Sequence, residues 1–147
     1  MDTLEIALRL GAATLVGAAL GLNRDLHNKP TGVRTLGLVG LGAAVVVLAV
    51  AITGESGAVS RVVQGLVTGI GFLGAGVIIR SEQNRQIHGL TTAACTWLSA
   101  CLGATCGAGD WRILFLSVPL IFAVLIFGGP IEDAIHRIWP HDESEEG

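Results

Sequence analysis

Long apolar runs alternate with short polar stretches along most of the chain. An α-helix needs about 20 predominantly apolar residues to cross the hydrocarbon core of a bilayer, and five runs approach that length. The stretches between them contain the polar residues, proline and glycine that are typical of connections. The pattern predicts an all-α membrane protein, a compact bundle of about five transmembrane helices at Leu4–Leu22, Thr35–Thr53, Val62–Ile79, Leu90–Cys106 and Ile113–Phe127.

The apolar pattern changes after the fifth run. Gly129-Pro130 is expected to break the helix. Ile131, Ile135 and Ile138 then recur at helical spacing, which predicts a short amphipathic helix lying at the membrane interface. An extension of the fifth helix is the alternative. The expected domains are a transmembrane domain over residues 1–129 and an amphipathic helix with an acidic, disordered tail over residues 130–147.

The third run has an unusual glycine content. Residues Val67–Arg80 read VTGIGFLGAGVIIR. In a water-soluble helix each of these glycines would cost roughly 1 kcal/mol relative to alanine. In a bilayer, small residues let helix backbones approach closely, and packing then drives association. We therefore expect the third helix to be a packing surface, through Gly65, Gly69, Gly71, Gly74 and Gly76.

Glycine pairs spaced four apart occur in other runs as well. Gly17 and Gly21 form one in the first run, and Gly103 and Gly107 form another at the end of the fourth. Such pairs favour close helix contacts in membranes, so they support a compact bundle or a dimer. The glycines of the third run can face a second protomer, neighbouring helices or a water-filled cavity.

Composition agrees with a membrane protein. The chain is 51% hydrophobic and 14% charged, whereas charged residues make up about 25% of soluble domains. A glycine-rich soluble α/β domain is the alternative that these values disfavour. No basic patch interleaved with aromatic residues points to nucleic acid. Cys95, Cys101 and Cys106 lie in one apolar run and are expected to be packing residues.

Basic residues are distributed unevenly between the two sides of the predicted bundle. The first run lacks a basic segment before it, so we expect a retained span and not a signal peptide. Short loops rich in lysine and arginine face the cytoplasm. This rule predicts an N-terminus outside and a C-terminus in the cytoplasm. The cytoplasmic residues counted are Arg24, Lys29, Arg34, Arg80 and Arg85, against Arg9, Arg61 and Arg112 on the other side.

Polar residues gather after the first span. Asn23, Arg24 and Asp25 lie in this connection, and Arg34 opens the second span. One interpretation is a positive anchor with one compensating acid. The other is a ligand or partner site, in which the flanking arginines hold Asp25 ionised and fixed.

A second polar cluster opens the fourth span. His88 precedes Thr91 and Thr92, either of which can cap a helix, and the free N–H groups there could bind an anion or a carbonyl. A cap without a ligand is the alternative. Gln64 and Thr68 share a face of the third span, where an interhelical hydrogen bond is expected.

Charge is scarce within the spans. Arg9, four residues after Glu5, is the exception, and it is either an interfacial ion pair or a charged site inside the bundle. No Ser-His-Asp, Cys-His, paired-carboxylate or phosphate-loop pattern is present. We therefore expect a protein that is not an enzyme, with no catalytic residue, no cofactor and no metal site.

Three segments of the chain match a known family pattern. They are GLNRDLHNKPTGVRTLGLVGLGAA (Gly21–Ala44), VTGIGFLGAGVIIR (Val67–Arg80) and HGLTTAACTW (His88–Trp97). In sequence, order and separation, these segments resemble the MgtC/SapB family of membrane proteins. Two features depart from the family pattern. Asn23 stands where glutamate is usual, and the sequence is expected to lack the cytoplasmic C-terminal domain of the best-known members.

The resemblance implies a multi-pass protein of the bacterial inner membrane. Family members are linked to growth at low magnesium, and some to survival inside host cells. They look like modulators of other membrane machinery, with the F-type ATP synthase as a proposed target, and are not generally regarded as magnesium transporters. The implied partners are the lipid bilayer, a second copy in a homodimer or other homo-oligomer, and another membrane protein.

Two functions are compatible with these observations. The first is a regulatory membrane protein that acts by contact, through the polar residues at its cytoplasmic surface. The second is a small-ion transporter or channel for a cation, with Gln64, Thr68 and Thr96 along its path. The shortage of charge within the spans favours the first function, because ion paths through membranes usually contain charged residues or unwound carbonyls.

Overall fold

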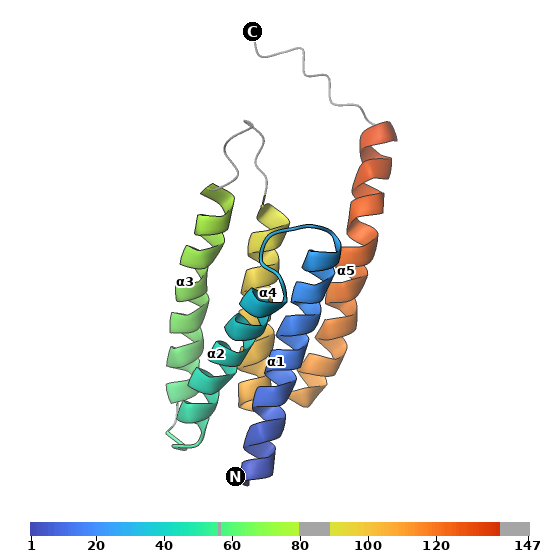
Figure 1. The fold of residues 1–147 in the computed structure, drawn as a ribbon. Helices are drawn as coiled ribbons and strands as arrows, with labels where there is room; N and C mark the ends of the chain where they lie inside the picture. Colours follow the sequence, from blue (N-terminus) through green and yellow to red (C-terminus); the bar gives the residue numbers. More distant parts are fainter. Residues whose placement is uncertain (56, 80–88, 139–147) are drawn as a thin grey trace. The chain divides into compact units, whose positions relative to one another are not determined.

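The structure, a computed structural model, consists of α-helices joined by short connections (Figure 1). It describes residues 1–55, 57–79 and 89–138, apart from the side chains of Ile79, Asp133 and His136. Within those ranges there is no strand, which confirms the predicted all-α class. The helices are α1 (Thr3–Leu26), α2 (Val33–Ala51), α3 (Ala58–Ile79), α4 (Leu90–Ala108) and α5 (Trp111–Ile138).

The chain divides into two compact units, Met1–Leu114 and Phe115–Gly147. The first contains α1 to α4, and the second contains most of α5. The predicted domain division at residues 129 and 130 stays a prediction. The site described below lies entirely within the first unit.

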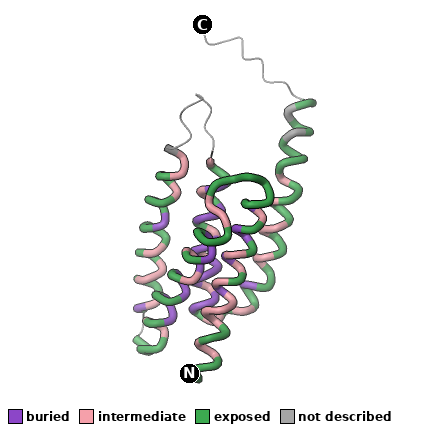
Figure 2. Tube along the Cα trace, in the orientation of Figure 1, coloured by how far each residue is buried: buried purple, intermediate pink, exposed green. Residues whose placement is uncertain are grey.

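Helices α1 to α4 form an antiparallel bundle in which α4 contacts each of the other three. Helix α2 packs extensively on both α1 and α4, whereas α3 packs mainly on α4. Buried positions accordingly concentrate on α2 and α4 (Figure 2). The core is built from small side chains as much as from large ones, for example Ala43, Ile70 and Ala100. Such a core lets the backbones approach closely.

Four helices, α1, α2, α3 and α5, are long and apolar enough to cross a membrane. Helix α4 has 19 residues, as α2 does, but it is richer in hydroxyl-bearing residues. Three of its hydroxyls, those of Thr96, Ser99 and Thr105, donate to backbone carbonyls. Thr96 donates to the Thr92 carbonyl at 2.9 Å, and Ser99 donates to the Leu36 carbonyl of α2 at 2.7 Å. The surrounding helices therefore shield the Thr96 and Ser99 hydroxyls from lipid.

The glycine pairs of the first and fourth spans lie where helices meet. A Cβ on Gly17 would lie 2.5 Å from the Leu36 carbonyl oxygen, and one on Gly107 would lie 2.7 Å from that of Ala44. A Cβ on Gly103 would overlap the backbone of Gly40 in α2. Real Cβ atoms do not approach other atoms so closely, so these positions require glycine. The predicted close packing through these two pairs is confirmed.

The glycines of α3 have a different environment. A Cβ on Gly65, Gly69, Gly71 or Gly76 would have no neighbour within 4 Å, and only one on Gly74 would contact α4, at 3.6 Å from the Ala93 Cβ. Gly65, Gly69 and Gly76 share one face of α3, since they are spaced by four and seven residues. Among the residues that the structure describes, these three glycines pack against no other helix. Their packing against a second protomer stays a prediction.

Helix α5 does not break at Gly129-Pro130. It continues through this pair to Ile138 and also contains Pro119. The predicted break is therefore wrong, and the alternative, an extension of the fifth helix, is observed. Membrane helices tolerate proline because local adjustments satisfy the backbone groups that proline leaves free. The isoleucines at 131, 135 and 138 are all exposed along this extension.

Candidate functional site

A group of polar side chains lies at the end of the bundle where α1 ends and α2 and α4 begin. We call Arg24, Asp25, Arg34 and Thr92 the polar cluster. A hydrogen bond between Arg24 and Thr92 shows that the α1–α2 connection and the start of α4 lie at the same end of the bundle. This arrangement agrees with the predicted alternation of the spans, which places both segments on one side of the membrane.

Arg24 is the buried member of the polar cluster. Its side chain comes from the last turn of α1 and is 6% exposed, and its Nη2 donates to Thr92 Oγ1 at 2.6 Å. Among the residues described, its Nε has no hydrogen-bond partner and no carboxylate forms an ion pair with the guanidinium. A buried cation without a carboxylate is costly, so its contacts are closely constrained. Arg24 therefore connects α1 to the first turn of α4.

Asp25 acts on a different helix. Its Oδ2 accepts a hydrogen bond from the backbone N–H of Val33 at 2.9 Å. Helix α2 has no side-chain cap from its own N-cap residue, Gly32. A carboxylate at a helix N-terminus satisfies free N–H groups and interacts favourably with the helix dipole. A Cβ on Gly32 would overlap the Asp25 carboxylate and displace it from this position.

The loop between α1 and α2 is a tight turn, as its proline and glycine predict. The residues with positive φ are Asn28 and Thr31, with φ of 52° and 62°. Positive φ is rare for a β-branched residue such as threonine. The Thr31 Oγ1 is buried and has no hydrogen-bond partner among the described residues. The loop backbone is therefore strained at Thr31.

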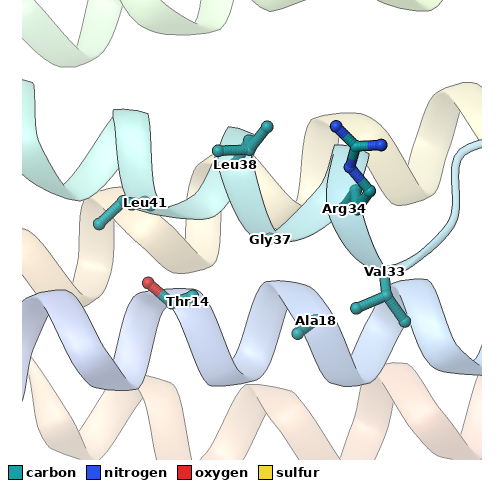
Figure 3. A pocket seen from close by; sticks show the side chains of 7 residues that line it. All are labelled: Thr14, Ala18, Val33, Arg34, Gly37, Leu38 and Leu41. Carbon is teal, nitrogen blue, oxygen red and sulfur yellow. The ribbon is translucent and has the colours of Figure 1, made fainter.

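Arg34 is exposed and lies in the first turn of α2. It lines one end of a groove of about 390 Å³ between α1 and α2 (Figure 3). The rest of the lining is uncharged. The three charged residues of the polar cluster are therefore close in sequence but contact different parts of the bundle. Arg24 contacts α4, Asp25 caps α2 and Arg34 borders the groove.

The threonines at the start of α4 do not cap it, contrary to the prediction. The N-cap residue is Gly89, with φ of 99°, and it provides no side-chain hydrogen bond. The helix therefore begins before Thr91 and Thr92, which lie within its first turn. Thr91 is exposed, whereas Thr92 is buried against Arg24. His88 lies outside the described residues, as do Arg80 and Arg85.

The remaining predicted site residues contribute less. Gln64 is exposed, and Thr68 donates to the Gln64 carbonyl of its own helix at 2.9 Å. The expected interhelical hydrogen bond from this pair is not formed within the described chain. Asn23 is half-buried, and its backbone oxygen lies 2.7 Å from His27 Nδ1.

At the opposite end of the bundle, Arg9 forms an ion pair and is also a charged site inside the bundle, so both predicted alternatives apply to it. It forms the predicted ion pair with Glu5. Its side chain is also largely buried, and Nη1 donates to the Gly107 carbonyl at 2.9 Å. A cation is favourable at the C-terminal end of a helix, here α4. A Cβ on Gly109 would lie 2.5 Å from the Arg9 Cζ, so the guanidinium occupies the space beside this glycine.

Sequence reasoning missed Ser99, which is fully buried and links α4 to α2. A signal was present, because Thr92, Thr96, Ser99 and Gly103 recur at helical spacing and mark one face of small residues.

The three cysteines are free, and Cys95 and Cys106 are buried as predicted for packing residues. Within the ranges described, no group of three His, Cys, Asp or Glu side chains could hold a metal ion.

Comparisons with known proteins identify relatives over nearly the whole chain. The family model described as MgtC family matches residues 10–134. The chain is 41% identical over 140 residues to Protein SrpB of Synechococcus elongatus, an alignment that covers 87% of this chain and 76% of that protein. It is 39% identical over 140 residues to Protein MgtC of Salmonella typhimurium, covering 95% of this chain and 58% of that protein.

A third relative is Protein SapB of Bacillus subtilis, 34% identical over 131 residues, covering 84% of this chain and 56% of that protein. The chain therefore spans between about half and three quarters of the length of these relatives. No solved structure matches the chain.

Proposed function

The chain belongs to the MgtC family, and from this premise we propose that it is a regulatory membrane protein of magnesium homeostasis, acting by contact with other membrane proteins. Its family and its four long apolar helices make it a multi-pass bacterial membrane protein in contact with the lipid bilayer. The proposed role is non-enzymatic. The F-type ATP synthase is the first partner to test, because the family resemblance points to it.

The closed interior of the bundle is the observation that carries this proposal. Backbones of α1, α2 and α4 approach so closely at Gly17, Gly103 and Gly107 that a Cβ would not fit there. The hydroxyls of Thr96 and Ser99 are both donated to backbone carbonyls. A conducting path needs polar groups that line water. The close backbone contacts and the paired hydroxyls of these three helices, as far as they are described, favour regulation by contact over conduction.

Two surfaces are available for contact with a partner. One is the glycine face of α3, formed by Gly65, Gly69 and Gly76, which no described residue covers. The other is the end of the bundle that carries Asp25, Arg34 and Thr91, all exposed. We propose that the first surface mediates helix–helix association in the membrane. The second would then select the partner on the cytoplasmic side.

A deletion strain tests this proposal. Growth at limiting magnesium is expected to fall on deletion and to be restored by the wild-type gene. Crosslinking in intact membranes, followed by detergent extraction, is expected to recover a membrane protein with the wild-type chain. Wild-type growth of the deletion strain, together with no crosslinked membrane partner, would overturn the proposal.

The alternative function, transport of a small ion, has a separate test. Purified protein reconstituted into liposomes is assayed for flux of magnesium, potassium, sodium and chloride, with a known channel as a positive control. We expect no flux above that of empty liposomes. Saturable flux of any of these ions would favour transport over regulation by contact.

A further inference from the structure

The groove between α1 and α2 has one charged end and an uncharged length. Its lining residues are Thr14, Ala18, Val33, Arg34, Gly37, Leu38 and Leu41. Figure 3 shows the side chains of Arg34 and Val33 at one end of the groove and those of Thr14 and Leu41 at the other. From Arg34 to Leu41 the helix rises by about 10 Å. The groove therefore extends from the polar end of α2 toward the middle of the membrane.

Small residues produce this groove. Ala18 and Gly37 face each other, because a Cβ on Gly37 would lie 3.8 Å from the Ala18 Cβ. Leu38, beside them, is 65% exposed and forms an apolar wall. Because α1 and α2 are both membrane-spanning candidates, we expect the open side of the groove to face hydrocarbon. The occupant must therefore be apolar along most of its length.

Arg34 is an uncompensated cation at the groove's polar end. Asp25, the nearest acid in the sequence, directs its Oδ2 to the Val33 N–H. Among the described residues Arg34 has neither an ion pair nor a side-chain hydrogen bond. A guanidinium offers two parallel N–H donors, which match the oxygens of a phosphate. An anionic group is thus expected beside Arg34.

We propose that this groove binds an anionic phospholipid, with its phosphate at the Arg34 guanidinium and part of one acyl chain between Ala18, Gly37 and Leu41. Basic pockets between transmembrane helices are typical sites for anionic lipid headgroups. A volume of about 390 Å³ is in the range of small-molecule sites. A helix of about 10 Å diameter is too wide to enter such a groove. A free anion would gain nothing from its apolar length.

Native mass spectrometry of the purified protein in detergent tests the proposal. The protein is titrated with phosphatidylglycerol or with zwitterionic phosphatidylcholine of the same chain length. We expect wild-type protein to retain phosphatidylglycerol about fivefold more strongly, as one arginine near a headgroup provides. Arg34→Gln is expected to abolish this preference, and Arg34→Lys to keep most of it.

A matched control is Arg112→Gln, because Arg112 is also exposed and lies at the start of α5, outside the groove. It is expected to keep the wild-type preference. Glycerol phosphate, which has the charge but no acyl chain, is expected not to compete with the lipid. Equal retention of both lipids by the wild type, an unchanged preference in Arg34→Gln, or effective competition by glycerol phosphate would each overturn the proposal.

Discussion

At the scale of single residues, the adjacent pair Arg24 and Asp25 serves two different helices. Arg24 reaches α4 through Thr92, and Asp25 caps α2 at Val33. The sequence identified both residues, because charge is rare in this chain and these charges lie next to a predicted turn. It did not identify their partners. Those depend on the rotation and axial position of α4, which no local pattern encodes.

The hydrogen bond between Arg24 and Thr92 can be tested by two substitutions of the threonine. Thr92→Val keeps the shape but removes the acceptor of a buried guanidinium, and we expect a loss of about 1.5–3 kcal/mol in the free energy of unfolding. Thr92→Ser keeps the hydroxyl and should lose clearly less. Thermal unfolding in detergent measures both. Equal losses for the two variants would show that the hydroxyl contributes nothing.

Gly103 provides a second test at this scale. A Cβ added here would overlap the Gly40 backbone, so α2 and α4 would have to separate. We expect Gly103→Ala to lower the free energy of unfolding by about 1–3 kcal/mol, the range typical of overpacked cores. Gly42→Ala is the control, because a Cβ on Gly42 meets nothing within 4 Å. Alanine there should be neutral or stabilising, and similar melting temperatures for the two variants would contradict the expected contact.

At the scale of elements, hydrophobic pattern predicted the helices better than it predicted their ends. All five predicted spans correspond to helices. The predicted end of α5 at Gly129-Pro130 was wrong, because proline interrupts a helix in water more reliably than in a membrane. Helix α4 shows a second limit of the pattern. It is the most enclosed helix of the bundle, so its buried hydroxyls lower its hydropathy without any contact with lipid.

The length of α5 leads to a prediction about its position in the membrane. Its 28 residues span about 42 Å, which exceeds the hydrocarbon thickness of about 30 Å. We expect its last two turns to lie in water on the cytoplasmic side. In a chain whose native cysteines are replaced by alanine, Arg137→Cys should react with a membrane-impermeant maleimide only when the cytoplasmic face is accessible.

Val124→Cys, in the middle of α5, is the control and should remain unlabelled from either face. Val124 is 70% exposed within the protein, so lipid alone would protect it. Labelling of Arg137→Cys in intact cells would reverse the predicted orientation. Labelling of Val124→Cys in intact membranes would contradict the placement of α5 across the bilayer.

At the scale of the whole molecule, the sequence does not distinguish glycines that pack inside the bundle from glycines that are open on its surface. Small-xxx-small spacing is the same in α1, α3 and α4. The structure shows that Gly17, Gly103 and Gly107 are covered inside the bundle, whereas Gly65 and Gly69 are open. Small-xxx-small spacing indicates that another helix backbone can approach closely. It does not indicate whether that helix belongs to the same chain.

Assembly of the protein is therefore expected to depend on the open face of α3. Gly69→Leu should reduce the homo-oligomer measured by crosslinking in membranes or by native mass, because a bulky side chain would separate the helices. Gly71→Leu is the control, since Gly71 is equally open but lies on the other side of α3. Unchanged oligomer mass in Gly69→Leu, or the same loss in both variants, would argue against this face as the interface.

The two arginines of α1 together fix the axial position of α4 relative to α1. Residue 9 contacts residue 107, and residue 24 contacts residue 92, so the same length of each helix, about 22 Å, separates the two contacts. Sliding α4 along α1 by one residue would break both contacts together. Substitutions in the central turns of α1 and α4 therefore leave both contacts in place. A single-residue insertion or deletion between the two contacts in one helix must be matched by the same change in the other.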